Sequence, residues 1–133
     1  MKIALDSNVL IAAFATDGLC RSILELCLNH HEIILSEELL EEVNENLQKK
    51  IRIPPARVRE VIHYLKNNAT MGKGQQGFQT TGCRDADDVK VLNLIVTAKV
   101  DMLVTGDKDL LSLREFQSIP IVSPRDSLSR LQR

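Results

Sequence analysis

Four acidic side chains at widely separated positions could together hold a divalent metal ion: Asp6, Glu42, Asp88 and Asp107. Asp6 closes a short apolar run, and Asp107 follows a second such run at residues 101–104. A set of carboxylate oxygens selects Mg²⁺ or Mn²⁺ over zinc. A metal held in this way can activate water and stabilise charge on a phosphoryl oxygen, so these residue types favour phosphodiester hydrolysis.

Carboxylates gathered in one place need a cation to compensate their repulsion. Each pair at ~5 Å costs about 3 kcal/mol at an effective dielectric of 20. Asn8 and Thr105 could add further oxygens or hold bridging waters. Asp85 is a weaker candidate, because its position before a helix is typical of a cap.

Each acid also has an ordinary structural interpretation. Asp6 and Asp107 can cap the helices that follow them, and Asp88 can act as the capping partner of Asp85. Glu42 can lie on a solvated helix face, and Asp109 is interpreted as a surface charge. The joint placement of the four acids at one sheet edge is what favours a site.

Strands and helices alternate along the chain, which predicts an α/β fold with a parallel sheet and helices on both faces, a three-layer α/β/α sandwich. The predicted strands are residues 2–6, 32–35, 69–71, 101–104 and 119–122. The predicted helices are residues 9–14, 19–29, 37–50, 57–66, 86–99 and 124–131, with a short helical turn at 110–113. In such a sheet, ligands bind at the carboxyl ends of the strands, where Asp6 and Asp107 would both lie.

Helical spacing directs the other two acids to the same edge. Asp88 lies in the first turn of its helix and shares a face with apolar Leu92 and Ile95. Glu42 directly precedes apolar Val43, in the second turn after a strand. Both side chains should therefore lean towards the sheet.

Length and composition fit a single domain over residues 1–133. Aromatic residues make up only 3% of the chain, which argues against a base-stacking platform. The net charge of −1 argues against general electrostatic adhesion to nucleic acid. The three cysteines are an odd number without CxxC spacing, which indicates a reducing, cytoplasmic setting. No segment approaches the length of a membrane span, so we expect no membrane partner.

Two stretches fall outside this scheme. Residues 72–83 contain four glycines, a composition that predicts a mobile loop. A loop of this length in a small domain is often functional, and this one could gate the site. A basic cluster is formed by Lys49, Lys50, Arg52, Arg57 and Arg59. Such a cluster is usually a solvated face, although it could follow a phosphate backbone.

Five segments, in order, resemble the sequence of PIN-domain nucleases. ALDSNVL is similar to the opening motif, SEELLEEV to the second acidic motif, RDADDVKVLNL to the third and DMLVTGDKDLL to the fourth. The closing IPIVSPRDSL resembles the tail of the VapC-like toxins of toxin–antitoxin systems. The resemblance extends from Lys2 to about Leu128.

The resemblance implies a five-stranded parallel sheet in the order 3-2-1-4-5 and Mg²⁺- or Mn²⁺-dependent cleavage of single-stranded RNA. It places the family's acids on Asp6, Glu42, Asp88 and Asp107, and its supporting polar residues on Asn8 and Thr105. It also implies a homodimer and an inhibiting antitoxin protein, and the expected nucleic-acid partner is single-stranded or structured RNA.

Two departures from the family pattern remain. The Gly-rich stretch before Arg84 is unusually long. Asp87 and Asp88 are adjacent, so the choice between them rests on the helix face.

Two other readings stay open. The chain could be a catalytically silent PIN-fold module that binds RNA or protein without metal-dependent turnover. It could also be a phosphoryl-accepting receiver-type domain, but that class needs a pair of acids after the first strand, where this chain has only Asp6.

Overall fold

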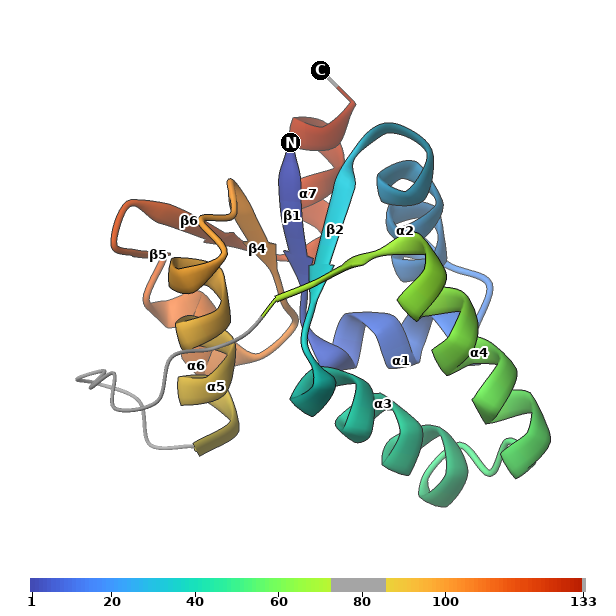
Figure 1. Cartoon of the computed structure of the whole chain (residues 1–133). Helices are drawn as coiled ribbons and strands as arrows, with labels where there is room; N and C mark the ends of the chain where they lie inside the picture. Colours follow the sequence, from blue (N-terminus) through green and yellow to red (C-terminus); the bar gives the residue numbers. More distant parts are fainter. Residues whose placement is uncertain (73–85, 133) are drawn as a thin grey trace.

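The computed structural model describes residues 1–72 and 86–132, and within them six strands form one sheet in the order β3-β2-β1-β4-β6-β5 (Figure 1). The strands are β1 (Lys2–Leu5), β2 (Glu32–Leu35), β3 (Thr70–Met71), β4 (Met102–Val104), β5 (Glu115–Phe116) and β6 (Ile119–Val122). All neighbours pair in parallel except β5, which runs antiparallel to β6. The predicted order 3-2-1-4-5 is thereby confirmed for the five parallel strands.

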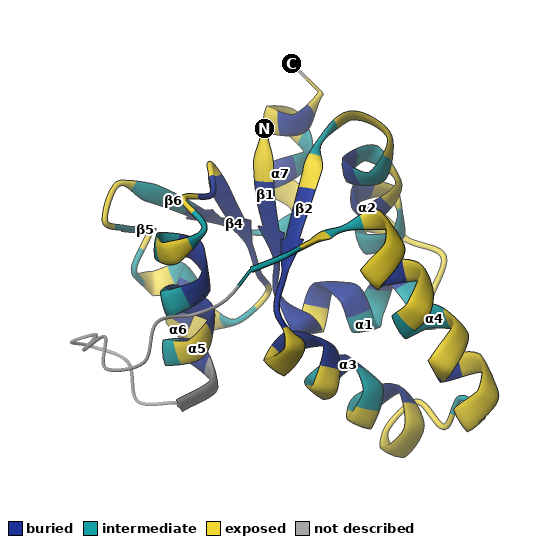
Figure 2. Cartoon of the chain, in the orientation of Figure 1, coloured by how far each residue is buried: buried dark blue, intermediate teal, exposed yellow. Residues whose placement is uncertain are grey.

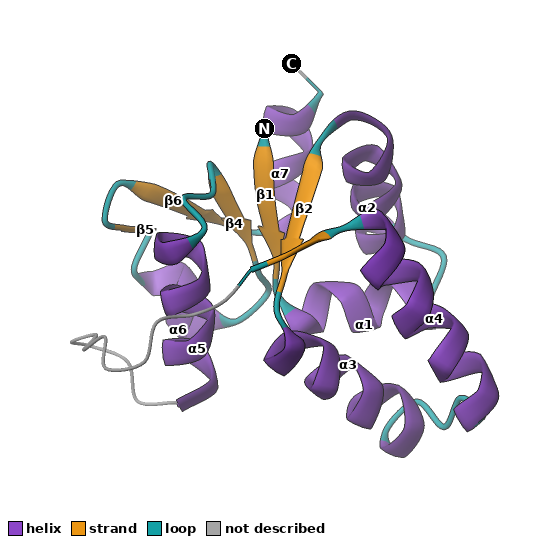
Figure 3. Cartoon of the chain, in the orientation of Figure 1, coloured by secondary structure: helices purple, strands orange, loops and turns teal. Residues whose placement is uncertain are grey.

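Helices cover both faces of this sheet (Figure 3). They are α1 (Ser7–Ala15), α2 (Leu19–His30), α3 (Glu37–Lys49), α4 (Pro55–Asn68), α5 (Ala86–Thr97), α6 (Lys108–Ser112) and α7 (Pro124–Leu131). One core cluster joins the sheet to α1–α4 and α7, and a second joins its other face mainly to α5 and α6. This is the predicted three-layer arrangement.

The central strand β1 is buried on both faces (Figure 2). Ile3 and Leu5 belong to the first core cluster and Ala4 to the second, because successive side chains of a strand point to opposite faces. All three residues are completely buried. An uninterrupted apolar run is what a strand covered on both faces requires.

Local signals set the helix ends close to their predicted positions. The Ser36 hydroxyl accepts a hydrogen bond from the backbone N–H of Leu39 at 3.2 Å, which caps α3 as predicted. Pro55 begins α4, where its missing N–H costs nothing. α1 begins at Ser7, two residues before the predicted start, because Asp6 acts as its N-cap.

The edge strand β5 was not predicted. It is two residues long, and the turns around it place Arg114, Gln117 and Ser118 at φ of 62°, 49° and 69°. Glycine or asparagine normally marks such left-handed positions. Their absence removes the sequence signal for a hairpin.

The Gly-rich stretch beyond Gly72 and the candidate Asp85 lie outside the described residues. The gating and capping interpretations placed there therefore stay predictions. Among the helices that the structure describes, none combines the length and the apolar character needed to span a bilayer.

Candidate functional site

Asp6 lies at the carboxyl end of β1 with only 6% of its surface exposed. Its Oδ1 accepts a 2.8 Å hydrogen bond from the backbone N–H of Ser7. Its Oδ2 accepts one of 2.7 Å from the Thr105 hydroxyl and a longer one of 3.4 Å from the Asn8 side-chain amide. The carboxylate is thus held in one orientation while it caps α1.

Thr105 connects this carboxylate to the end of β4. The two strands are neighbours, with Leu5 paired to Val104, so the residues that follow them lie at one edge of the sheet. Thr105 is completely buried, and its hydroxyl also accepts a 3.0 Å hydrogen bond from the backbone N–H of Asp107. The same side chain therefore orients Asp6 and fixes the turn that carries Asp107.

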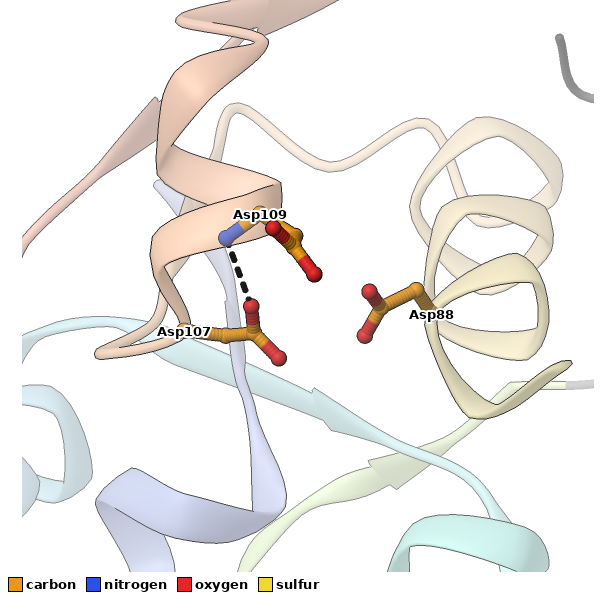
Figure 4. A group of neighbouring side chains, drawn as sticks. All are labelled: Asp88, Asp107 and Asp109. Carbon is orange, nitrogen blue, oxygen red and sulfur yellow. Dashed lines mark hydrogen bonds between the residues drawn. The ribbon is translucent and has the colours of Figure 1, made fainter. Parts of the chain in front are cut away.

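Three carboxylates converge beside this turn (Figure 4). Asp88 on α5, Asp107 and Asp109 each offer one oxygen, and these oxygens all lie within 4.8 Å of one another. Asp107 Oδ1 accepts hydrogen bonds from the backbone N–H groups of Asp109 at 2.8 Å and Leu110 at 3.4 Å, which caps α6. Asp88 is 6% exposed, Asp107 partly buried and Asp109 exposed.

Glu42 is linked to Asp6 through Ser7. The Ser7 hydroxyl donates a 2.8 Å hydrogen bond to Glu42 Oε2, between two helices that pack together, α1 and α3. Ser7 is also the residue whose backbone N–H binds Asp6. Hydrogen bonds therefore link Glu42, through Ser7, to the carboxylate of Asp6.

The family model described as PIN domain matches residues 2–109, which is most of the chain and includes all of these acids. The chain belongs to the PIN-domain family. An uncharacterized protein of Methanocaldococcus jannaschii is 29% identical over 121 residues, covering 86% of this chain and 76% of that protein.

One solved structure has a similar fold. It is a chain from the crystal structure of VapBC2 from Rickettsia felis, bound to a DNA fragment from their promoter. The match has a TM-score of 0.65 at 12% sequence identity and covers 92% of this chain and 98% of that one. At this identity the likeness establishes the fold.

The sequence-predicted acids of this PIN domain fall into two connected groups. Asp88 and Asp107 belong to the close carboxylate cluster. Asp6 is joined to Asp107 by the two hydrogen bonds of the Thr105 hydroxyl. Glu42 is joined to Asp6 by the hydrogen bonds of Ser7. Asn8 binds Asp6 and also accepts a 3.2 Å hydrogen bond from the backbone N–H of Gly106. The metal-binding and catalytic roles of all these residues stay predictions.

Sequence reasoning missed two members of this arrangement. Asp109, interpreted as a surface charge, contributes an oxygen to the cluster, and Ser7 holds Glu42. The signal for Asp109 was its position two residues after Asp107 at the start of a helix, where neighbouring first-turn side chains can face one partner element. Ser7 carried no comparable signal.

The donor set suits a hard divalent cation. Every member of the cluster offers a carboxylate oxygen, the ligand type that Mg²⁺ and Mn²⁺ prefer. Asp88 is buried beside the other two carboxylates, and a cation bound between them would reduce their mutual repulsion. The residues therefore fit the ion that PIN domains, which are generally nucleases, usually employ.

Proposed function

We propose that this PIN-domain protein is a metal-dependent endoribonuclease that cleaves single-stranded RNA. The observation that carries the proposal is the convergence of Asp88, Asp107 and Asp109 at the sheet edge, next to the buried and oriented carboxylate of Asp6. An edge of this kind, at the carboxyl ends of parallel strands, is where α/β folds bind their ligands.

Asp88, Asp107 and Asp109 would hold Mg²⁺ or Mn²⁺, with Asp6 and Glu42 beside them. The bound cation supplies polarisation of a phosphoryl oxygen and acidification of water. In the reaction, a water oxygen forms a new bond to phosphorus and the bond to the 3′ oxygen breaks. Carboxylates of the site accept a proton from water, the departing 3′ oxygen takes up a proton from solvent, and the products are a 3′-hydroxyl and a 5′-phosphate.

Other polar groups of the chain keep the acids in place for this step. Thr105 and Asn8 direct hydrogen bonds at Asp6, and Ser7 directs one at Glu42. Because these donors come from the chain itself, the carboxylates need little rearrangement when substrate arrives.

We further propose that the protein is the toxin of a toxin–antitoxin pair, acting as a homodimer in the cytoplasm and inhibited by a cognate antitoxin protein. Two observations support this: the resemblance of residues 119–128 to the tail of VapC-like toxins, and the similarity of the fold to a chain of VapBC2. Copurification of the protein with the product of an adjacent gene, and loss of RNA cleavage in that complex, would test it.

A second candidate is a catalytically silent PIN-fold module that binds RNA or protein. One observation favours it: Asp6 caps α1 and Asp107 caps α6, so both carboxylates have a structural role that does not require a metal. This candidate predicts partner binding without metal-dependent turnover.

The deciding experiment incubates the metal-stripped protein with a mixed RNA pool, with and without Mn²⁺, and sequences the new ends. We expect Mn²⁺-dependent cleavage in the wild type and none in Asp6→Asn or Glu42→Gln. Asn is also a good N-cap, so Asp6→Asn should keep the fold. Glu41→Gln, an exposed neighbour on the same helix, is the matched control. Cleavage by Asp6→Asn would contradict the nuclease proposal.

A further inference from the structure

A second charged feature lies away from the acids, where the end of α1 meets the starts of α2 and α4. Three arginines, Arg21, Arg52 and Arg57, line a hollow of about 390 Å³. Its apolar lining includes Phe14, Ile53 and Val61. We call this hollow the arginine pocket.

The positive charge of the arginine pocket is largely uncompensated. Arg52 and Arg57 are exposed and make no side-chain hydrogen bond or ion pair within the described residues. Arg21 donates to the backbone carbonyl of Ala13 at 3.1 Å, and its ion pair with Asp17 is long, at 3.9 Å, and exposed. Exposed pairs of this kind contribute little. The pocket is therefore ready to accept an anion.

The start of α4 adds to this preference. Pro54, its N-cap residue, makes no capping hydrogen bond through its side chain, and the first turn contains no acid. In contrast, α3 carries Glu37 and Glu38 in its first turn. The positive end of a 14-residue helix thus faces the pocket without a negative side chain of its own.

A second hollow is lined by residues that bind Asp6 and reaches Ile51, the residue before Arg52 of the arginine pocket. It has a volume of about 510 Å³ and lies between α1 and α3, with Ser7 and Asn8 at one end and Lys50 and Ile51 at the other. Ile51 precedes Arg52 in the chain. From Ser7 to Ala15, α1 rises about 12 Å. The two hollows share no lining residue, but two consecutive residues of the chain, Ile51 and Arg52, line one and the other.

The lining of the second hollow fits a nucleotide. Ile11 and Ala12 offer apolar surface to a base, and Lys50 offers a cation to its phosphate. Asn46 donates from its side-chain amide to the Glu42 backbone carbonyl at 2.8 Å, which leaves its Oδ1 without a partner among the described residues. A base with an exposed N–H could donate to that oxygen.

We propose that these two hollows bind the RNA strand on one side of the scissile phosphate, with a base on the apolar surface between α1 and α3 and a backbone phosphate in the arginine pocket. The proposal rests on the nuclease function above and extends it to the substrate path. An acidic partner protein would match the charge of the arginines, but the hollow next to them is lined by Ser7 and Asn8, which bind Asp6, and this favours the strand that is cut there.

The test measures RNA binding in EDTA, where cleavage cannot interfere, by fluorescence anisotropy of a single-stranded RNA of about ten nucleotides. Arg52→Gln and Arg57→Gln should each bind about tenfold more weakly, the loss of one charge-assisted contact. Each should also reduce the salt dependence, log K against log salt, by about 0.7. With Mn²⁺, both should raise KM and leave kcat nearly unchanged.

Arg114→Gln is the matched control. Arg114 is also exposed and left-handed, at φ 62° against 64° for Arg52, but it precedes β5 at the opposite edge of the sheet from α4. The proposal would be overturned if the three variants Arg52→Gln, Arg57→Gln and Arg114→Gln had the same RNA affinity and the same salt dependence. It would also be overturned if the wild type did not bind RNA. If RNA binding depends on the arginines but Mn²⁺ produces no cleaved RNA ends, the RNA path would be supported and the nuclease function rejected.

Discussion

The hydroxyl of Thr105 lies 2.7 Å from Oδ2 of Asp6 and donates a hydrogen bond to it, although the two residues are 99 positions apart. The same hydroxyl accepts the backbone N–H of Asp107 at 3.0 Å. One buried side chain therefore joins the end of β1 to the turn after β4, and both ends carry acids of the candidate site.

Thr105→Val keeps the shape of the side chain but removes the hydroxyl. Asp6 then loses its shortest side-chain donor and the Asp107 N–H loses its acceptor, so we expect a destabilisation of about 1–3 kcal/mol in urea unfolding. RNA cleavage should fall at least about tenfold, by the loss of one oriented hydrogen bond. Thr105→Ser should restore both quantities. Wild-type cleavage by Thr105→Val would show that this bond does not orient the site.

Asp109→Asn tests the acid that sequence reasoning assigned to the surface. In the wild type, Mn²⁺ should raise the thermal unfolding temperature, because an ion that binds only the folded state stabilises it. Asp88→Asn and Asp109→Asn should both reduce this shift. Asp126→Asn, an exposed first-turn acid of α7, is the control and should keep it. If Mn²⁺ raised the unfolding temperature of Asp109→Asn as much as that of the wild type, Asp109 would not be a metal ligand.

Gly72→Ala tests the close approach between the end of β3 and α5. A Cβ at this position would lie 2.7 Å from Leu94 Cδ1 and 3.4 Å from Ile34 Cγ2. Leu94 is only 1% exposed, so its methyl group has little room to move. We expect a loss of about 1–2 kcal/mol in urea unfolding. Gly18→Ala, whose Cβ would be 3.8 Å from its nearest neighbour, should lose less; equal losses would contradict the steric explanation.

Burial raises the pKa of the Cys27 thiol to about 11, against an ordinary value of 9.0, with partial opposition from the N-terminal amine. The unfolded chain therefore releases this proton first as the pH rises. The free energy of unfolding should be unaffected by Cys27 below pH 9 and fall between pH 9 and 11, by at most about 1.4 kcal/mol per unit. Urea unfolding of Cys27→Ala should show a shallower decline over this range. Identical declines would exclude a contribution from this thiol.

Local patterns were enough to predict the central part of the fold. The apolar run of β1, the Ser36 cap and the two prolines at the start of α4 act through neighbouring residues, so their effects can be predicted from the sequence. The hairpin of β5 could not be read in this way, because Arg114, Gln117 and Ser118 adopt conformations that their residue types disfavour.

The candidate site divides in the same manner. Asp6 and Asp107 follow predictable strands, so their shared edge could be inferred from alternation alone. The inclusion of Asp109 depends on where α5 sits opposite α6, which packing over the whole sheet determines. The hydrogen bond from Ser7 to Glu42 likewise depends on how α1 packs on α3.

The position of β1 between β2 and β4 has a consequence during translation. Asp6 is translated 99 residues before Thr105, so it leaves the ribosome before β4, the strand that completes its surroundings, and before the turn that bears Thr105 and Asp107. A polypeptide interrupted before residue 105 cannot form the hydrogen bond that orients Asp6, so the acids assemble only after β4 and the turn that follows it have been added.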